Sequence, residues 1–199
     1  MGTVFEVPTA RGPARVHVEG GPGRATLVLG HGAGGGVTAP DLVAVRAAAL
    51  TAGLQVVLVE QPYRVAGRRA PAPAAHLDES WTTVVGALVR RGPLVVGGRS
   101  SGGRVACRTA HATGADAVVC LAFPLVPPRA ARPTTRAPEL DAVRLPVLVV
   151  QGARDRFGMP SGTETRDVVV VEGDHSLNTD PDAVASCVTA FLRRVLSLG

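Results

Sequence analysis

The sequence lacks two common residue types, lysine and isoleucine. All 21 basic residues are therefore arginine, against 16 acidic residues, and the formal net charge is +5. A nucleic-acid-binding surface needs its basic residues gathered in a run or on one face. Here the arginines occur singly or in pairs such as Arg68-Arg69, Arg90-Arg91 and Arg193-Arg194. This bias is typical of a GC-rich genome, and we expect no nucleic-acid partner.

Cysteine is also scarce. The three thiols, Cys107, Cys120 and Cys187, are an odd number, and no two of them have the C-x-x-C spacing. These facts argue against a disulfide framework and against a zinc site. Each thiol lies in an apolar stretch, so we expect buried structural thiols.

Long apolar runs and a targeting segment are missing as well. The longest apolar runs are too short to span a bilayer, so we expect no membrane partner. The first residues, MGTVFEVP, lack the charged and apolar regions of a signal peptide. These absences predict a protein of the reducing cytoplasm.

What the sequence does contain is an alternation of short strand patterns and helical patterns. From the third strand pattern onward the runs are continuously apolar, which is typical of parallel strands covered on both faces. The first two alternate apolar and polar residues, which predicts an antiparallel hairpin at the sheet edge. The expected strands are Val4–Val7, Ala14–Val18, Ala25–Leu29, Gln55–Glu60, Leu94–Val96, Ala117–Leu121, Val147–Gln151 and Asp167–Val171.

Helical patterns fill the intervals between the strands. The first surrounds Leu42 and ends at Gly53, the second surrounds Trp81 and ends near Gly92, and the last begins at Pro181. The alternation predicts a three-layer α/β sandwich with a mostly parallel sheet and an N-terminal antiparallel edge. At 199 residues, the chain is expected to form a single domain over residues 1–199.

The strongest local signal is the segment LVVGGRSSGGRVACRTA, which contains the pattern G-x-S-x-G over Gly98–Gly102. The pattern follows a buried strand and opens a helix, which is the context of a nucleophile elbow. Small residues on both sides of Ser100 allow the sharp, strained turn that exposes its hydroxyl. We therefore expect Ser100 to be a catalytic nucleophile.

A serine hydroxyl needs a base to take its proton. Downstream, Asp155 follows one expected strand and His175 follows the next. This gives the order serine, acid, histidine along the chain, which is the order found in folds that contain a nucleophile elbow. We expect His175 to act as the base and Asp155 to orient it, with Asp174 as the alternative acid. The remaining histidines outside the glycine-rich loop are expected at the surface: His17, His76 and His111.

The third part of such a site is an oxyanion hole. The segment TLVLGHGAGGG runs from a buried strand into a glycine-rich loop that can present backbone N–H groups. We expect the donors to be the N–H of Ala33, with Gly34 as the alternative, and the N–H of Ser101, the residue after the nucleophile. His31 is expected to be a structural hydrogen-bonding residue of this loop.

The same loop supports a second hypothesis. Gly30–Gly35 satisfies G-x-G-x-x-G after a strand, and Glu60 ends the next strand, as in a dinucleotide site. However, Glu60 is farther from the first glycine than such sites require, and the next helix is expected near Pro40 rather than at Gly35. This hypothesis also leaves Ser100, Asp155 and His175 without a role.

Taken together, these segments resemble the α/β-hydrolase superfamily. More narrowly, they are similar to a small lidless branch of dienelactone-hydrolase-like size, which includes the testis-expressed hydrolase-like proteins and the hydrolase-like domain of a nonspecific-lethal chromatin-complex subunit. The chain departs from that branch at Ser101, where methionine is typical. The matching segments are LGHGAGG, EQPYRVAGRRAP, GGRSSGGRVA, LAFPLVPP, VLVVQGARDRFG and GDHSL.

The resemblance implies where a cap domain would be inserted. The corresponding connection, Ala122–Pro146, is too short for one, so we expect an open, shallow site edged by Phe123, Leu125 and Tyr63. Four arginines lie near the motifs. Arg68, Arg69 and Arg99 are candidates for a positive site mouth, whereas Arg69 and Arg104 are expected rather to be structural and to donate to loop carbonyls.

The residues and the resemblance predict a cofactor-independent serine hydrolase without a metal, acting on a small-molecule carboxylic ester or related acyl bond. Ser100, His175 and Asp155 form the expected triad. A non-catalytic binding or scaffold protein on the same fold is the alternative, and a dinucleotide-binding protein is the third. The sequence does not determine the natural substrate or the oligomeric state.

Overall fold

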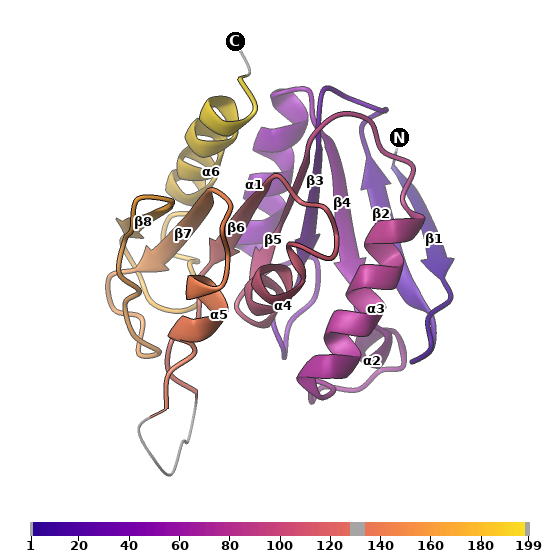
Figure 1. Ribbon diagram of the computed structural model, residues 1–199, viewed down its shortest axis with the longest axis horizontal. Helices are drawn as coiled ribbons and strands as arrows, with labels where there is room; N and C mark the ends of the chain where they lie inside the picture. Colours follow the sequence, from indigo (N-terminus) through magenta and orange to yellow (C-terminus); the bar gives the residue numbers. More distant parts are fainter. Residues whose placement is uncertain (1, 128–133, 198–199) are drawn as a thin grey trace.

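An eight-stranded β-sheet forms the centre of the protein (Figure 1). The computed structural model describes residues 2–127 and 134–197. The strands lie in the order β1-β2-β4-β3-β5-β6-β7-β8 across the sheet. Their bounds are Thr3–Val7 (β1), Ala14–Glu19 (β2), Thr26–Gly30 (β3), Gln55–Glu60 (β4), Leu94–Arg99 (β5), Ala117–Leu121 (β6), Val147–Gly152 (β7) and Arg166–Val171 (β8).

The direction of the strands follows their hydrophobic patterns. β1 and β2 pair antiparallel, and β2 also pairs antiparallel with β4. The remaining neighbours, from β4 through β3 to β8, pair parallel. β1 lies at the sheet edge, and its first four residues are exposed. The predicted antiparallel edge is therefore confirmed.

Helices cover both faces of this sheet (Figure 1). α1 and α6 pack on one face, whose core includes Leu42 and Val188. α2 to α5 lie on the other face, whose core includes Trp81 and Val105. The three-layer fold is confirmed. The helix bounds are Pro40–Thr51 (α1), Pro62–Val65 (α2), Ala74–Ala87 (α3), Ser101–Thr109 (α4), Ala137–Asp141 (α5) and Pro181–Val195 (α6).

Two element ends differ from the prediction by three residues or more. β5 continues past Val96 to Arg99, through glycines that carry no side chain for a pattern to reveal. α3 ends at Ala87 rather than near Gly92, because Leu88 is already extended, with φ −74° and ψ 133°. Gly92 is a turn residue with φ +67°, packed so closely that a Cβ there would lie 2.3 Å from the Arg24 carbonyl oxygen.

The connection between β6 and β7 shows no separate cap domain in its described part. It holds only the five-residue helix α5, and the segment 128–133 is outside the described residues. Within the part of the chain that the structure describes, no helix is both long enough and apolar enough to cross a bilayer.

The cysteines are free thiols that lie at three positions in the fold. Cys107 on α4 and Cys120 on β6 are buried, as predicted, with their sulfur atoms 3.4 Å apart. Cys187 on α6 is only partly buried, because it packs at the margin of the core.

Candidate active site

Ser100 occupies the turn between β5 and α4. Its backbone has φ 50° and ψ −106°, a strained conformation for a residue with a side chain. The turn is fixed by the Ser100 N–H, which donates to the Leu121 carbonyl on β6 at 2.8 Å. The Ser100 side chain is therefore presented at the carboxyl edge of the parallel strands, where open α/β sheets bind ligands.

Both glycines of G-x-S-x-G lie so close to β3 that no side chain fits at either position. A Cβ at Gly98 or at Gly102 would lie 2.4 Å from the Gly30 carbonyl oxygen, which is closer than atoms can approach. The pattern therefore records a close packing of the turn against β3, as expected from the sequence.

The structure brings Ser100, His175 and Asp155 into one chain of hydrogen bonds. The distance between His175 Nε2 and Ser100 Oγ is 3.0 Å, and His175 Nδ1 lies 2.8 Å from Asp155 Oδ2. Asp155 follows β7 and His175 follows β8, so each residue reaches the same sheet edge as Ser100. With Nδ1 donating to the carboxylate, Nε2 is left to accept the Ser100 proton.

Asp155 is held in place by donors that the sequence analysis did not identify. Its side chain is 0% exposed. The Phe157 N–H donates to Oδ1 at 2.9 Å, and the Gln151 side-chain amide donates to Oδ2 at 2.8 Å. Gln151 is itself fully buried on β7. A polar residue inside the apolar run VLVVQG was the only signal that could have indicated this role.

The alternative acid, Asp174, has a different environment. Its carboxylate accepts hydrogen bonds from the Ser176 N–H at 2.8 Å and the Ser176 hydroxyl at 2.6 Å. These hydrogen bonds lower the pKa of Asp174. Asp174 is thus engaged by Ser176, and the carboxylate beside the His175 ring is that of Asp155.

The glycine-rich loop after β3 runs beside Ser100. A Cβ at Gly32 would lie 3.7 Å from the Ser100 Cβ. The Tyr63 hydroxyl donates to the Ala33 carbonyl at 2.8 Å, which fixes the loop from α2. Within residues 2–127 and 134–197, the N–H groups of Ala33, Gly34 and Ser101 donate no hydrogen bond. The choice of Ala33 over Gly34 as an oxyanion donor therefore stays a prediction.

His31 is a structural residue of this loop. Its Nδ1 lies 2.8 Å from the Gly32 carbonyl oxygen, and its Nε2 accepts from the Gln61 N–H at 3.1 Å. Burial lowers the pKa of His31, which favours the neutral ring that these two bonds require.

The arrangement does not favour the dinucleotide hypothesis. α1 begins at Pro40, as expected, and no helix N-terminus directly follows the glycines in the described chain. Glu60 pairs with Arg15 on β2 at 3.3 Å and so is not presented to the loop as a ribose acceptor.

Two of the arginines near the motifs are paired with carboxylates. Arg104 donates two hydrogen bonds to Glu139, at 2.8 and 2.5 Å. Arg99 pairs with the buried Asp41, with Nε 3.1 Å from Oδ2. The expectation that Arg99 adds net positive charge to the site mouth is therefore wrong, because Asp41 neutralises it.

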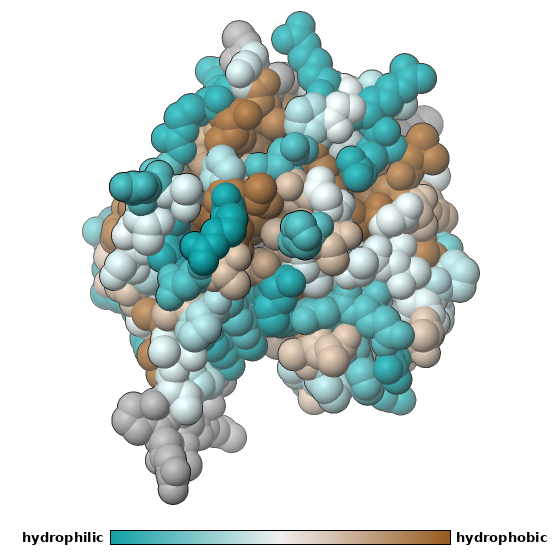
Figure 2. All heavy atoms as spheres, viewed as in Figure 1, coloured by the Kyte–Doolittle hydropathy of each residue, from teal (hydrophilic) through white to brown (hydrophobic). Residues whose placement is uncertain are grey.

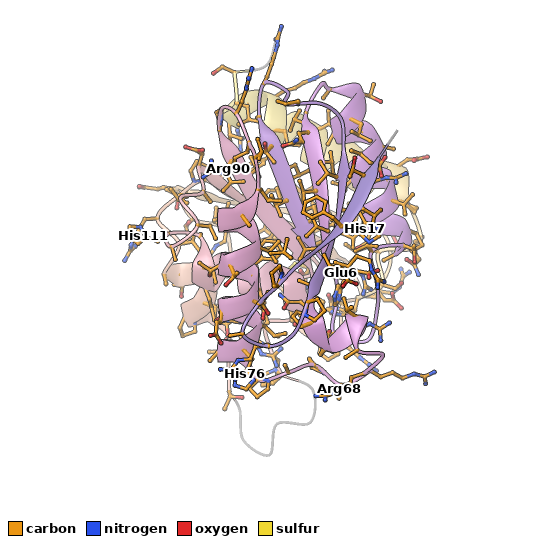
Figure 3. The ribbon with its side chains drawn as sticks, turned by 90° about the vertical axis from the view of Figure 1, so that its right-hand side faces the viewer. Glu6, His17, Arg68, His76, Arg90 and His111 are labelled. Carbon is orange, nitrogen blue, oxygen red and sulfur yellow. The ribbon has the colours of Figure 1, made fainter. Side chains whose placement is uncertain are left out.

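The other two arginines and the remaining histidines are exposed or half-buried. Arg68 and Arg69 are exposed in the segment after α2. Figure 3 shows His17, His76 and His111 far from one another, with Arg68 at the same end of the molecule as His76. His111 is exposed, and the other two are half-buried.

In the described part of the chain, no separate cap domain covers the site. A hollow of only about 10 Å³ borders Ser101, Gly102 and Tyr63. A cavity of about 660 Å³ lies elsewhere, between the C-terminal end of α4 and α5, and none of the predicted site residues lines it. Phe123 does not edge the site as expected, because its side chain is 0% exposed in the core.

Comparisons with known proteins agree with this architecture. The family described as alpha/beta hydrolase domain matches residues 23–186. No curated protein sequence matches the chain. A lidless α/β serine hydrolase from Xanthomonas campestris is 18% identical, with a TM-score of 0.76, over 97% of this chain and 94% of that chain.

Two further solved structures have the same fold. Est1E from Butyrivibrio proteoclasticus is 13% identical, with a TM-score of 0.80, over 98% of this chain and 99% of that chain. A dienelactone hydrolase from Anabaena variabilis is 15% identical, with a TM-score of 0.74, over 98% of this chain and 97% of that chain.

Proposed function

Because the chain belongs to the α/β-hydrolase family, we propose that it is a serine hydrolase that cleaves a carboxylic ester or a related acyl bond without a cofactor. The observation that carries this proposal is the hydrogen-bonded chain from Ser100 through His175 to Asp155, with distances of 3.0 and 2.8 Å. A nucleophile, a base and an orienting carboxylate in this order are what acyl transfer requires.

The first half of the reaction forms an acyl-enzyme. Ser100 Oγ attacks the substrate carbonyl carbon while His175 Nε2 accepts the hydroxyl proton. Asp155 keeps the Nδ1 proton in place and stabilises the imidazolium. The N–H groups of Ala33 and Ser101 bind the negative oxygen of the tetrahedral intermediate. The intermediate collapses when His175 returns its proton to the leaving alcohol.

The second half regenerates the enzyme. A water molecule gives a proton to His175 Nε2 and attacks the acyl carbon. The second tetrahedral intermediate then releases the carboxylic acid and returns the proton to Ser100 Oγ. The His175 side chain is 20% exposed, so solvent water reaches it without the opening of a cap.

The open site supports a substrate with a small or solvent-exposed acyl group. A long buried lipid would need a cap or a tunnel to cover it, whereas the described part of the β6–β7 connection holds only the five-residue helix α5. We therefore propose short-chain and aromatic acyl esters as the first class to assay. The aromatic class includes a feruloyl ester, because ferulic acid is bound to Est1E in its solved complex.

A fluorophosphonate probe tests the proposal directly, since it reacts only with an activated serine. We expect the wild-type protein to be labelled and to cleave short p-nitrophenyl esters. Ser100→Ala should abolish labelling and lower kcat by more than about 10³-fold. Ser186→Ala, at an exposed position on α6, is the matched serine control and should behave as wild type.

A wild-type protein that is folded but neither labels nor cleaves any ester, thioester or amide of the panel would contradict the proposal. That result would favour the non-catalytic binding protein. Labelling that survives in Ser100→Ala would instead move the nucleophile to another residue.

A further inference from the structure

Asp41 is a charged residue in an unexpected place. It stands in the first turn of α1, and its side chain is 0% exposed. Its ion-pair partner is Arg99, the last residue of β5 and the neighbour of Ser100 in the chain. Nothing in the sequence pattern of α1 distinguishes a buried carboxylate from an exposed one, so Asp41 was not predicted.

The Arg99 guanidinium contacts two further segments. Nη2 donates a hydrogen bond to the His175 carbonyl oxygen at 3.1 Å. Nη1 lies against the glycine-rich loop, so closely that a Cβ at Gly32 would be 3.0 Å from it. One side chain therefore touches the start of α1, the loop that precedes Ala33 and the loop that carries the proposed base.

Burying this ion pair costs free energy, because both charges lose their hydration. Burial raises the pKa of Asp41, although the charge of Arg99 opposes the shift. Buried ion pairs often contribute no more stability than apolar residues of similar volume would. What a guanidinium adds is reach, since its charge lies beside the Asp41 carboxylate while a separate N–H group donates to the His175 carbonyl.

The contact with His175 is made to the backbone and not to the ring. It fixes where the His175 main chain sits relative to β5, and thereby how far Nε2 lies from Ser100 Oγ. Displacements of about 1 Å in such a site can lower a rate by about 10²-fold. A donor that restrains this loop therefore affects the chemical step without touching the substrate.

We propose that Arg99 is a positioning residue, anchored by Asp41, that holds the His175 loop and the Gly32–Ala33 turn in register with Ser100. The inference rests on the proposed hydrolase function of this site. Arg99 acts through His175 and the loop, and the carboxylate of Asp41 holds the charged guanidinium beside the start of α1.

The experiment compares Arg99→Gln and Arg99→Lys with Arg104→Gln as the matched control. Arg104 also forms a part-buried ion pair, with Glu139, on the same segment of the chain. We expect Arg99→Gln to lower kcat by about 10- to 100-fold, with KM changed by less than about threefold. Arg104→Gln should lower the unfolding temperature and leave kcat within about twofold of wild type.

Arg99→Lys separates positioning from simple charge compensation. Lysine can keep a positive charge beside Asp41, but its single ammonium lacks the forked geometry that reaches Asp41 and the His175 carbonyl together. We expect a thermal stability close to wild type with kcat still lowered at least about tenfold. Arg99→Lys also serves if Arg99→Gln fails to fold.

A proton NMR measurement gives a readout that does not depend on turnover. The Nδ1 proton of His175, shared with Asp155, should give a downfield resonance in the wild type that broadens or shifts in both Arg99 variants. Folded Arg99 variants with unchanged kcat and an unchanged resonance would overturn the inference while leaving the proposed function intact. A wild type that is inactive and unlabelled defeats the proposed function, and with it this inference.

Discussion

At the scale of single residues, the site depends on contacts that fix backbone groups as well as on those that fix side chains. Tyr63 is one example, because its hydroxyl binds the Ala33 carbonyl at 2.8 Å. Burial raises the pKa of Tyr63 to about 12, so the phenol keeps its proton and remains a donor through the neutral and alkaline range. The direction in which the Ala33 N–H points is thereby linked to a side chain of α2.

Tyr63→Phe tests this contact. The ring and its edge-to-face packing on His31 are retained, so only the hydrogen bond is lost. We expect the free energy of unfolding to fall by about 1 kcal/mol and kcat to fall several-fold, because the loop is less well fixed. Urea unfolding and ester kinetics measure the two effects. An unchanged kcat would show that the loop does not need this anchor.

Gly102 shows how little space separates α4 from β3. In Gly102→Ala the new Cβ would lie 2.4 Å from the Gly30 carbonyl oxygen. Because both atoms are attached directly to the backbone, no side-chain rotation can relieve this clash. We expect a loss of about 1–3 kcal/mol of stability, or failure to fold. Gly86→Ala on α3 is the control, because nothing lies within 4 Å of its Cβ. That substitution should stabilise the helix by up to about 1 kcal/mol.

At the scale of elements, a cluster of charges joins the helices on one face of the sheet. Glu139 on α5 accepts from Arg104 and Arg108 on α4, and Arg108 also donates to Asp78 on α3. Burial alone would raise the pKa of Glu139, but the hydrogen bonds and charges of the two arginines lower it overall. The carboxylate is therefore stabilised by this cluster in the folded protein.

Glu139→Gln is expected to lower the stability of the protein by an amount that depends on pH. The pKa of Glu139 is lowered in the folded protein. The contribution of its carboxylate to the free energy of unfolding is therefore fully present above the pKa of the unfolded chain, near 4.5, and is lost as the pH falls through the folded pKa. At pH 7 the variant should be less stable by about 1–3 kcal/mol. Urea unfolding between pH 7 and 3 should show the difference shrinking with acid. A constant difference would argue for packing instead.

At the scale of the whole molecule, the sheet separates two apolar cores that share its strands. Trp81 lies in one core and Leu192 in the other. Figure 2 shows hydrophilic side chains spread over the viewed face, with hydrophobic surface between them, rather than one continuous hydrophilic surface. Because each of the strands β3 to β8 contributes side chains to both cores, we expect the two cores to unfold together. Unfolding of both cores in one transition is also what the prediction of a single domain over residues 1–199 implies.

Leu192→Ala tests this coupling across the sheet. The lost packing should cost about 2–5 kcal/mol. Trp81 is the only tryptophan of the chain, so its fluorescence reports on the opposite core. We expect its unfolding midpoint in urea to shift together with that of the far-ultraviolet circular dichroism. Separate midpoints for the two signals would indicate two independently unfolding parts.

The sequence by itself determined the features that depend on neighbouring residues. Continuous apolar runs located β3 to β8, because burial on both faces needs a continuous apolar segment, and alternating apolar and polar residues located β1 and β2. The small residues around Ser100 predicted its turn, because only they fit against a passing strand. The order of Ser100, Asp155 and His175 was also readable, since each follows a strand pattern.

Only the tertiary structure decided which distant residues meet. Sequence spacing left Asp155 and Asp174 both open, and the folded chain places the Asp155 carboxylate 2.8 Å from His175. The pairing of Asp41 with Arg99 and the donation from Gln151 to Asp155 were also unpredictable. A buried polar contact depends on side-chain direction across separate elements, and no local pattern of apolar and polar residues records that direction.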